Sequence, residues 1–514
     1  GWRDRDSVFY SPAFEEEEMT TSGYPRRVYL WERGTPASAA TLVYEAGKED
    51  MLAYGMRIWD QDSAYDFVVK MPTFYTQEQF LYRDATLHRL DLPADAKIAA
   101  VINGQLLVEL RSSWQRGGVS FGQGALIAAS IDAVVRGDAA FVAVFQPGPR
   151  QSVQGVSTTR STVLVSVLDN VVGGLISYTF DGQAWQQKEL AVPTMGSVDW
   201  LDTSRTTDRF FYRYTGFLSP TSIFEADAGC DEHHQVRSEP AWFDATTMQA
   251  TQHEAKSADG TMVPYFLVAP RDFVADGRAP TLLEGYGGFE ISMTPYYSGV
   301  LGESWLSRGG VYVLANIRGG GEFGPAWHQA ALKENRQRAF DDFIAVADDL
   351  IARKITSPAH LGIQGGSNGG LLVASVMVQR PELFGAVVCE VPLLDMQRYH
   401  RLLAGASWMA EYGNPDEPGD WAYLSAYSPY QNVRAGVTYP KVFFTTSTRD
   451  DRVHPGHARR MVARMLDQGH DVLYYENVEG GHGGAANQRQ RAHLHALIYS
   501  YLHERLAPDA GRVP

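Results

Sequence analysis

A serine enclosed by glycines is the residue of this sequence with the clearest chemical potential. Ser367 lies in the run 365–370, which contains the pattern G-x-S-x-G. An apolar, strand-like segment at 361–364 precedes this run, and a helical pattern at 370–379 follows it. A tight strand-to-helix turn lifts a hydroxyl above a sheet, and flanking glycines remove the Cβ clashes that such a turn creates. This context predicts a nucleophilic serine rather than an ordinary glycine-rich turn.

A serine hydroxyl is a poor nucleophile and needs a base within hydrogen-bond reach. The strand-like segment 441–448 is followed by Asp450 and Asp451, and the segment 472–478 is followed by a glycine-rich loop that contains His482. The order serine, acid, histidine, each after a later strand, is typical of α/β hydrolases. We predict His482 as general base and then general acid, oriented by one of the two aspartates. From the residues alone, either aspartate fits.

The negative charge that develops during acyl transfer needs hydrogen-bond donors. The backbone N–H of Asn368, directly after the predicted nucleophile, is the first expected donor. The second should come from the glycine-rich loop 284–289, whose backbone has the freedom to approach the serine. The run 317–322 is also glycine-rich but lacks the Lys-Ser/Thr pair of a phosphate-binding P-loop, so we predict no nucleotide site there.

The elements that must position these residues alternate between strands and helices over 255–514. This alternation predicts a mostly parallel, doubly wound sheet covered by helices on both faces. The clearest helix should start at Pro455 and stop at Gly469, with an apolar stripe at helical spacing between them. The expected strands contain the apolar runs 281–283, 311–315, 361–363, 386–389, 441–445 and 472–475.

The first half of the chain has a different character. Residues 1–250 are predicted to be short strands rich in Val, Ile, Tyr and Phe, separated by turn residues. A sandwich, a barrel or a propeller fits this pattern, because no clear internal repeat selects among them. We therefore expect an all-β domain at 1–250 and a catalytic domain at 251–514. The cluster 230–234, Cys-Asp-Glu-His-His, could ligate a metal, but a solvated loop is the stronger interpretation.

Composition narrows the classes of function. The 514 residues are 44% hydrophobic and 20% charged, which is ordinary globular composition and excludes disorder as the main state. The net charge of −15 disfavours nucleic-acid partners, and no apolar run is long enough to predict a membrane span. Two cysteines cannot build a disulfide framework, so we expect a cytoplasmic protein. We expect a monomer without a metal or an organic cofactor.

Five motifs in one order resemble the prolyl oligopeptidase family of serine peptidases. They lie at 285–289, 315–322, 365–370, 427–429 and 450–453. The resemblance is strong over 255–514 and loose over 1–250. It implies that the first domain is a β-propeller that caps the active site and admits peptides but not folded proteins. Family propellers are longer and the chain starts without Met, so we expect a domain truncated at its N-terminus. A periplasmic or secreted location stays open for the same reason.

The resemblance also implies a role for each site residue. Ser367 would be the nucleophile, Asp450 the orienting acid and His482 the base. The Tyr286 hydroxyl would join the Asn368 N–H as an oxyanion donor. The remaining residues would bind substrate: Arg452 would hold a substrate carbonyl, Phe289, Val453 and Tyr427 would line the pocket, and Trp421 or Tyr423 would supply an aromatic that stacks on proline.

The resemblance favours hydrolysis of short peptides after proline, through an acyl-enzyme. Relatives that cut after Arg or Lys, the oligopeptidase B branch, resemble this chain at 411–415 but carry an acid slightly upstream. The corresponding stretch here, 405–408, has no acid to pair with a basic side chain. An oligopeptidase B-like peptidase and a carboxylesterase on the same fold remain alternatives. An inactive binding scaffold is a third, although the intact Ser367, Asp450 and His482 argue against it.

Overall fold

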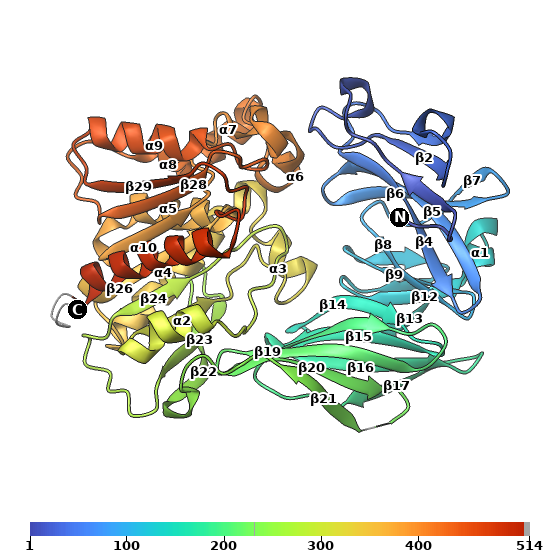
Figure 1. The fold of residues 1–514 in the computed structure, drawn as a ribbon, viewed down its shortest axis with the longest axis horizontal. Coiled ribbons are helices and arrows are strands. Elements are labelled where there is room, and N and C mark those ends of the chain that lie inside the picture. The colour runs from blue at the N-terminus through green and yellow to red at the C-terminus, as the bar shows by residue number, and fades with distance from the viewer. Residues whose placement is uncertain (231, 508–514) are drawn as a thin grey trace. The chain divides into compact units, whose positions relative to one another are not determined.

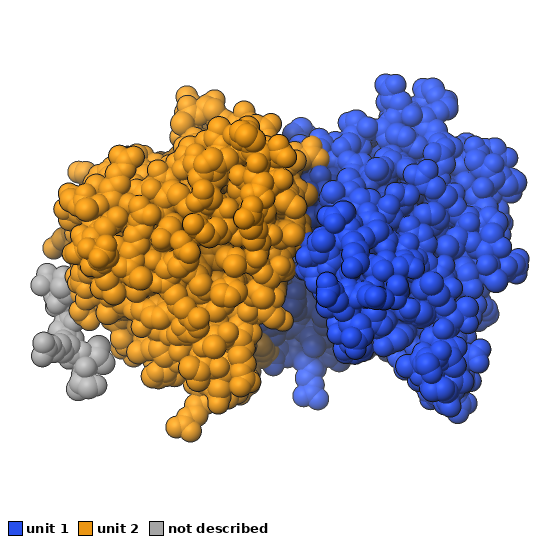
Figure 2. All heavy atoms as spheres, turned by 90° about the horizontal axis from the view of Figure 1, so that it is seen from above, with its two compact units in different colours: residues 1–215, 221–238, 323–326 blue, residues 216–220, 239–322, 327–514 orange. Residues whose placement is uncertain are grey.

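The chain folds into two compact units (Figure 2), and the computed structural model describes residues 1–230 and 232–507. Unit 1 comprises Gly1–Thr215, Thr221–Ser238 and Phe323–Ala326, and unit 2 contains Gly216–Pro220, Glu239–Glu322 and the chain from Trp327 onward. The sequence placed the boundary at residue 250, whereas the units divide after Ser238. The reason is that strand β22 (Met248–Lys256) pairs with β23 (Met262–Pro270) in the sheet of unit 2.

Unit 1 consists of small antiparallel sheets that follow one another along the chain (Figure 1). Within the described residues, four of these sheets have four strands, one has three, and one hairpin has two. The three-stranded sheet contains β1 (Ser7–Tyr10), β2 (Arg27–Glu32) and β3 (Thr41–Glu45). The next contains β4 (Leu52–Asp60), β5 (Ser63–Thr73), β6 (Thr76–Arg83) and β7 (Thr86–Arg89).

The remaining sheets of unit 1 continue this pattern. One contains β8 (Lys97–Ile102), β9 (Gln105–Glu109), β12 (Leu126–Ser130) and β13 (Val142–Phe145). Along the chain, the hairpin of β10 (Trp114–Arg116) and β11 (Val119–Phe121) lies between β9 and β12, and the short helix α1 (Ile131–Arg136) lies between β12 and β13. Another contains β14 (Gln151–Thr158), β15 (Thr162–Asp169), β16 (Val172–Phe180) and β17 (Trp185–Leu190). The last contains β18 (Ser197–Thr203), β19 (Arg209–Gly216), β20 (Ser219–Asp227) and β21 (His233–Ser238).

Apolar side chains fill the space between successive sheets of unit 1. Val28 of β2 belongs to the same buried cluster as Val68 of β5, and Leu107 of β9 to the same cluster as Val165 of β15. A third cluster joins Leu164 of β15 to Phe210 of β19. Consecutive sheets thus pack face to face in a series, which is the packing of propeller blades rather than of a two-layer sandwich.

Unit 2 is built on a mixed sheet of eight strands within the described residues. Their order is β22-β23-β25-β24-β26-β27-β28-β29, with the two pairings of β23 antiparallel and the others parallel. The mostly parallel sheet predicted from the alternation of elements is therefore confirmed. Every residue of β25 (Val311–Ala315) is buried, which explains the continuous apolar runs seen in the sequence.

The other strands of this sheet are β24 (Thr281–Glu284), β26 (Leu361–Gly366), β27 (Ala386–Glu390), β28 (Val442–Ser447) and β29 (Val472–Asn477). The longer helices are α4 (Gln337–Ala352), α5 (Asn368–Gln379), α7 (Pro418–Tyr427), α9 (Gly456–Asp467) and α10 (Gln488–Leu506). The short helices are α2 (Gly299–Ser304), α3 (Pro325–Gln329), α6 (Met409–Tyr412) and α8 (Pro429–Asn432). The predicted helix between Pro455 and Gly469 is confirmed as α9, and Gly469 has φ +85°.

The sheet order brings the predicted site loops together. Strands β24, β26, β27, β28 and β29 are consecutive neighbours and run parallel. The loop with Tyr286 follows β24, Ser367 follows β26, Asp450 follows β28 and His482 follows β29. Because the carboxyl ends of parallel strands share one edge of a sheet, these four loops emerge on the same side.

Candidate active site

Ser367 stands at a sharp turn between β26 and α5. Its backbone has φ +59° and ψ −116°, a region that residues with a side chain rarely adopt. Two hydrogen bonds hold it there. The Ser367 N–H donates to the carbonyl of Glu390 at 2.8 Å, and the Leu371 N–H donates to the Ser367 carbonyl at 3.1 Å. The strained turn predicted for the nucleophile is confirmed.

The glycines around Ser367 are required by space. A Cβ on Gly365 would lie 2.3 Å from the carbonyl oxygen of Gly369, and a Cβ on Gly369 would lie 2.8 Å from that of Gly285. Real Cβ atoms do not approach backbone oxygens so closely. The pattern G-x-S-x-G therefore reports the close packing of this turn on the loop after β24.

Asp450 and His482 form a hydrogen-bonded pair. The Oδ2 atom of Asp450 lies 2.8 Å from Nδ1 of His482. The Oδ1 atom accepts the backbone N–H groups of Arg452 and Val453, both at 2.9 Å. Asp450 is buried, whereas Asp451 is exposed. The structure thus favours Asp450 over Asp451 as the partner of His482, and the contact between His482 and the Ser367 hydroxyl stays a prediction.

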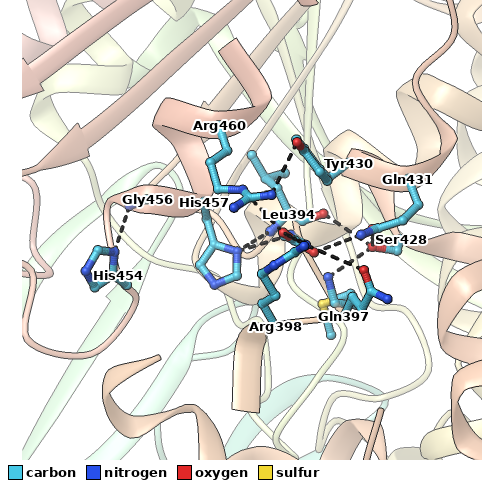
Figure 3. Close-up of polar contacts among 12 residues, drawn as sticks. Leu394, Gln397, Arg398, Ser428, Tyr430, Gln431, His454, Gly456, His457 and Arg460 are labelled. Atoms are coloured by element: carbon cyan, nitrogen blue, oxygen red, sulfur yellow. Dashed lines mark hydrogen bonds and ion pairs between the residues drawn. The ribbon is translucent and has the colours of Figure 1, made fainter. Parts of the chain in front are cut away.

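The loop that carries Asp450 is anchored through the start of α9. Figure 3 shows His457 pointing at the loop after β27, where its Nδ1 accepts the N–H of Leu394 at 3.2 Å. The Asp395 N–H donates to the same nitrogen at 3.1 Å. Burial lowers the pKa of His457 to about 4, so the ring is neutral and Nδ1 can accept both bonds. Arg460 adds an ion pair with Asp395 at 3.4 Å.

Tyr286 lies beside the serine. Burial raises the pKa of the Tyr286 hydroxyl, while a hydrogen bond with Ser367 and the positive charge of Arg452 act in the opposite direction. A raised pKa keeps the hydroxyl protonated at neutral pH, as a donor to an oxyanion requires. The backbone N–H of Asn368 is the first of α5, so it has no carbonyl partner within the helix. Both predicted oxyanion donors therefore lie next to Ser367.

The side chain of Asn368 is held by a buried polar network that the sequence did not reveal. Its Oδ1 accepts from the Tyr412 hydroxyl at 2.7 Å and from the guanidinium of Arg336. Its Nδ2 donates to the Tyr286 carbonyl at 2.6 Å. Arg336 in turn donates to Glu411 at 2.8 Å. Arg336, Asn368, Glu411 and Tyr412 are all buried. Arg336 has no recognisable signal in the sequence, and Glu411 was noted only as part of a family stretch.

The predicted substrate-binding residues are partly brought together. The ring of Phe289 meets Tyr412 edge-on, with centroids 5.6 Å apart. Tyr427 is buried and packs on Phe340 of α4 with centroids 5.2 Å apart, so its observed contacts are those of a core residue. The other predicted side chains are placed as follows: Val453 is buried, Arg452 is exposed, and Trp421 and Tyr423 are half-buried on α7. Their contacts with a substrate stay predictions.

Neither a metal cluster nor a membrane helix is found in the described part of the chain. Over residues 1–230 and 232–507, no group of three or more His, Cys, Asp or Glu side chains could hold a metal ion. One member of the cluster 230–234, Asp231, lies outside the described residues. No helix in those ranges is long and apolar enough to cross a bilayer.

Two family models match the chain. One, described as "Prolyl oligopeptidase, N-terminal beta-propeller domain", covers residues 1–239. The other, described as "Prolyl oligopeptidase family", covers residues 298–509. The first match confirms the propeller among the three architectures that the strand pattern allowed.

Individual relatives match over most of this chain. An uncharacterized peptidase of Sinorhizobium fredii, y4nA, is 44% identical over 98% of this chain and 71% of its own length. A prolyl endopeptidase of Elizabethkingia miricola is 35% identical over 61% of this chain and 45% of its own length. The solved structure of a post-proline cleaving enzyme from Rickettsia typhi is 34% identical, with a TM-score of 0.94 over 98% of this chain and 75% of that one.

Proposed function

This chain belongs to the prolyl oligopeptidase family and is a serine endopeptidase, and from that premise we propose that it cleaves short peptides on the carboxyl side of proline. The observation that carries the proposal is the Asp450–His482 hydrogen bond of 2.8 Å, on loops that leave the same edge of the sheet as the strained turn of Ser367. A hydrogen-bonded acid and imidazole, together with a serine at a strained turn on the same edge of the sheet, are the parts of an acyl-transfer site.

In the proposed reaction, Ser367 attacks the peptide carbonyl while His482 takes the hydroxyl proton. The imidazolium that results is stabilised by Asp450 and returns the proton to the leaving amine. An acyl-enzyme on Ser367 remains, and water attacks it with His482 acting again as base. The fixed Nδ1–Oδ2 contact supports this order, because it leaves the other ring nitrogen to face the serine.

The tetrahedral intermediate would be stabilised by two donors, the Tyr286 hydroxyl and the Asn368 N–H. The first is supported by its hydrogen bond with Ser367 and by the burial that keeps it protonated. The second is supported by its place at the N-terminus of α5, where the helix dipole favours negative charge. We propose that Arg452, whose charge acts on Tyr286, binds a substrate carbonyl nearby.

A preference for proline is supported by an aromatic contact at Phe289 and by a buried acid whose charge is already paired. Phe289, the predicted wall of the pocket, contacts the ring of Tyr412. Glu411 is buried and already paired with Arg336 and His328, so it has no charge to spare for a basic substrate side chain. An Arg or Lys bound there would lack a partner, which is costly. The Rickettsia and Elizabethkingia proteins carry names that refer to proline.

We further propose that the protein works as a cytoplasmic monomer on peptide substrates, with no nucleic-acid or membrane partner. The net charge of −15 supports the exclusion of phosphate backbones and anionic lipid.

The proposed specificity is tested by digesting a mixed peptide library and mapping the cuts by mass spectrometry. Cuts after proline support the proposal, and cuts after Arg or Lys indicate an oligopeptidase B-like enzyme instead. A proline anilide and a short-chain ester, compared in the same assay, separate a peptidase from a carboxylesterase. A folded chain that hydrolyses none of these substrates would favour a binding scaffold.

A further inference from the structure

We propose that Glu411 is a positioning residue that links the oxyanion donors to the substrate pocket through one buried carboxylate. The inference deepens the proposed function and rests on it. Glu411 lies on α6, on the polypeptide between β27 and β28. It acts through Arg336, Asn368 and the backbone of Phe289.

The first part of the argument is that the Glu411 carboxylate is buried and serves both sides of the site. Its Oε1 atom accepts the Phe289 N–H at 3.1 Å and Nη1 of Arg336 at 2.8 Å. Its Oε2 atom lies 2.7 Å from Nε2 of His328. The side chains of Glu411 and His328 are fully buried, and that of Arg336 is 1% exposed. One acid therefore fixes a backbone N–H of the predicted pocket and a cation at the same time.

The second part is that the cation passes this constraint to the oxyanion donors. Arg336 donates through Nη2 to Oδ1 of Asn368, and the Tyr412 hydroxyl donates to the same atom at 2.7 Å. With Oδ1 fixed by two donors, Nδ2 of Asn368 points at the Tyr286 carbonyl, 2.6 Å away. Asn368 carries one predicted donor and Tyr286 the other. The series of hydrogen bonds from Glu411 to Tyr286 thus fixes the positions of both predicted donors relative to Ser367.

The third part is that the loop at Gly288 packs directly against Asn368 and Arg336. A Cβ on Gly288 would lie 2.5 Å from Nδ2 of Asn368 and 2.8 Å from Nη2 of Arg336. The guanidinium also lies over the ring of Tyr412, 5.0 Å from its centroid. Packing this close transmits a displacement of Arg336 to Asn368 instead of absorbing it.

The fourth part concerns what a buried ion pair contributes. Replacing such a pair by apolar residues of similar volume is often neutral or stabilising, so burial of Arg336 and Glu411 is weak evidence for stability alone. Preorganised donors, in contrast, contribute to catalysis because they need no reorganisation when charge develops. The Arg336–Glu411 ion pair is connected by hydrogen bonds to both predicted oxyanion donors. This is the placement expected of a group that holds the donors in position before charge develops.

The experiment uses Glu411→Gln, Tyr412→Phe and a matched control in the full chain. Tyr412→Phe removes only the hydroxyl that donates to Asn368 and keeps the ring on Phe289. The control is Asp342→Asn, which removes the negative charge from another buried ion pair of unit 2, with Arg318 at 2.6 Å. For each variant we would measure kcat and KM on the preferred peptide, the rate of labelling by a fluorophosphonate, and the midpoint of thermal unfolding.

The two test variants should change kcat and KM to different extents, which a purely structural role of Glu411 does not predict. For Glu411→Gln we expect kcat to fall about tenfold to a hundredfold and KM to rise, since the change reaches both donors and pocket. For Tyr412→Phe we expect kcat to fall about threefold to tenfold with KM unchanged, because only Asn368 is affected. Labelling should slow in parallel. Asp342→Asn should lower the unfolding midpoint and keep kcat within about twofold.

The remaining outcomes would refute either the positioning role of Glu411 or the proposed function. If Glu411→Gln loses stability as the control does but keeps kcat and KM, Glu411 is only structural. If Glu411→Gln does not fold, an unchanged kcat of Tyr412→Phe overturns the inference by itself. If the wild-type chain neither hydrolyses peptides nor reacts with the fluorophosphonate, the proposed function fails, and this inference with it. An active wild type with two unaltered variants refutes the inference alone.

Discussion

Replacing Asp450 by Asn separates the electrostatic role of this acid from its structural role. The Oδ1 atom accepts the N–H groups of Arg452 and Val453, and Oδ2 accepts from His482. In Asp450→Asn the side-chain oxygen can keep both backbone bonds, so the amide nitrogen must face Nδ1 of His482. A donor then meets a donor unless the ring moves its proton to Nε2. In that tautomer Nε2 cannot accept the serine proton.

The expected loss is large because the tautomer, and not only a charge, is changed. Loss of the correct tautomer in such a triad lowers kcat by about a thousandfold to ten-thousandfold. At about 1.36 kcal/mol for each factor of ten, this is roughly 4 to 5.5 kcal/mol of transition-state stabilisation. The free energy of unfolding should change by no more than about 1 kcal/mol, since the turn keeps its two backbone bonds.

The assay is steady-state hydrolysis of the preferred peptide, with thermal unfolding as a check on folding. Asp451→Asn is the matched control, because Asp451 is the exposed neighbour with the same charge. We expect the control to keep wild-type kcat. An Asp450→Asn enzyme that retains more than a tenth of the wild-type kcat, or a control that loses activity instead, refutes the assignment of the acid.

Three further predictions concern the nucleophile, the substrate contact and a buried acid. Ser367→Ala should fold normally and lose more than 99% of turnover, about 3 kcal/mol or more, as measured by kcat; a larger residual rate removes Ser367 from its role. Arg452→Ala should lower kcat/KM for peptides about tenfold to a hundredfold through loss of a charge-assisted hydrogen bond, and an unchanged value argues against that contact. Burial raises the pKa of Glu322 from 4.5 to about 7, so folding takes up a proton between these values and the free energy of unfolding should fall as pH rises through this window. Glu322→Gln should reduce that fall by roughly 1 to 3 kcal/mol in chemical denaturation at pH 4 and pH 8, and equal slopes in both proteins would contradict the burial argument.

The parts of the site that follow strands could be predicted from the sequence. Glycine spacing around Ser367 reports a turn that backbone contacts demand, and the loops of Asp450 and His482 follow consecutive strands of the sheet. The choice between Asp450 and Asp451 could not be made from the residues, because either side chain can accept backbone N–H groups two or three positions later. The structure favours Asp450 through its burial and its contact with His482.

The supporting network could not be predicted, because its members are far apart along the chain. Arg336 and Glu411 are 75 residues apart, and local patterns treat each as a surface charge. The resemblance implies that Trp421 or Tyr423 supplies the ring that stacks on proline, and this stays a prediction. The ring that the structure places against Phe289 is that of Tyr412, which has no pocket role predicted from the sequence. Sequence spacing gives the order of aromatic residues along helices but not which ring faces the loop after β24.

The domain boundary shows a similar limit. The change from a strand-rich half to an alternation of strands and helices predicts the boundary near residue 250. In the structure, β22 is already part of the sheet of unit 2, paired with β23 over its whole length. Long-range pairing, which a local pattern does not report, decides to which unit a strand belongs.

The most direct test of the account is to identify the residue that reacts with a fluorophosphonate. The wild-type chain would be labelled, digested and mapped by tandem mass spectrometry, with Ser367→Ala and His482→Ala treated in parallel. The account predicts one adduct, on Ser367, that is absent from the first variant and forms far more slowly in the second. An adduct on another serine, or equal labelling of Ser367 without the imidazole of His482, would contradict it.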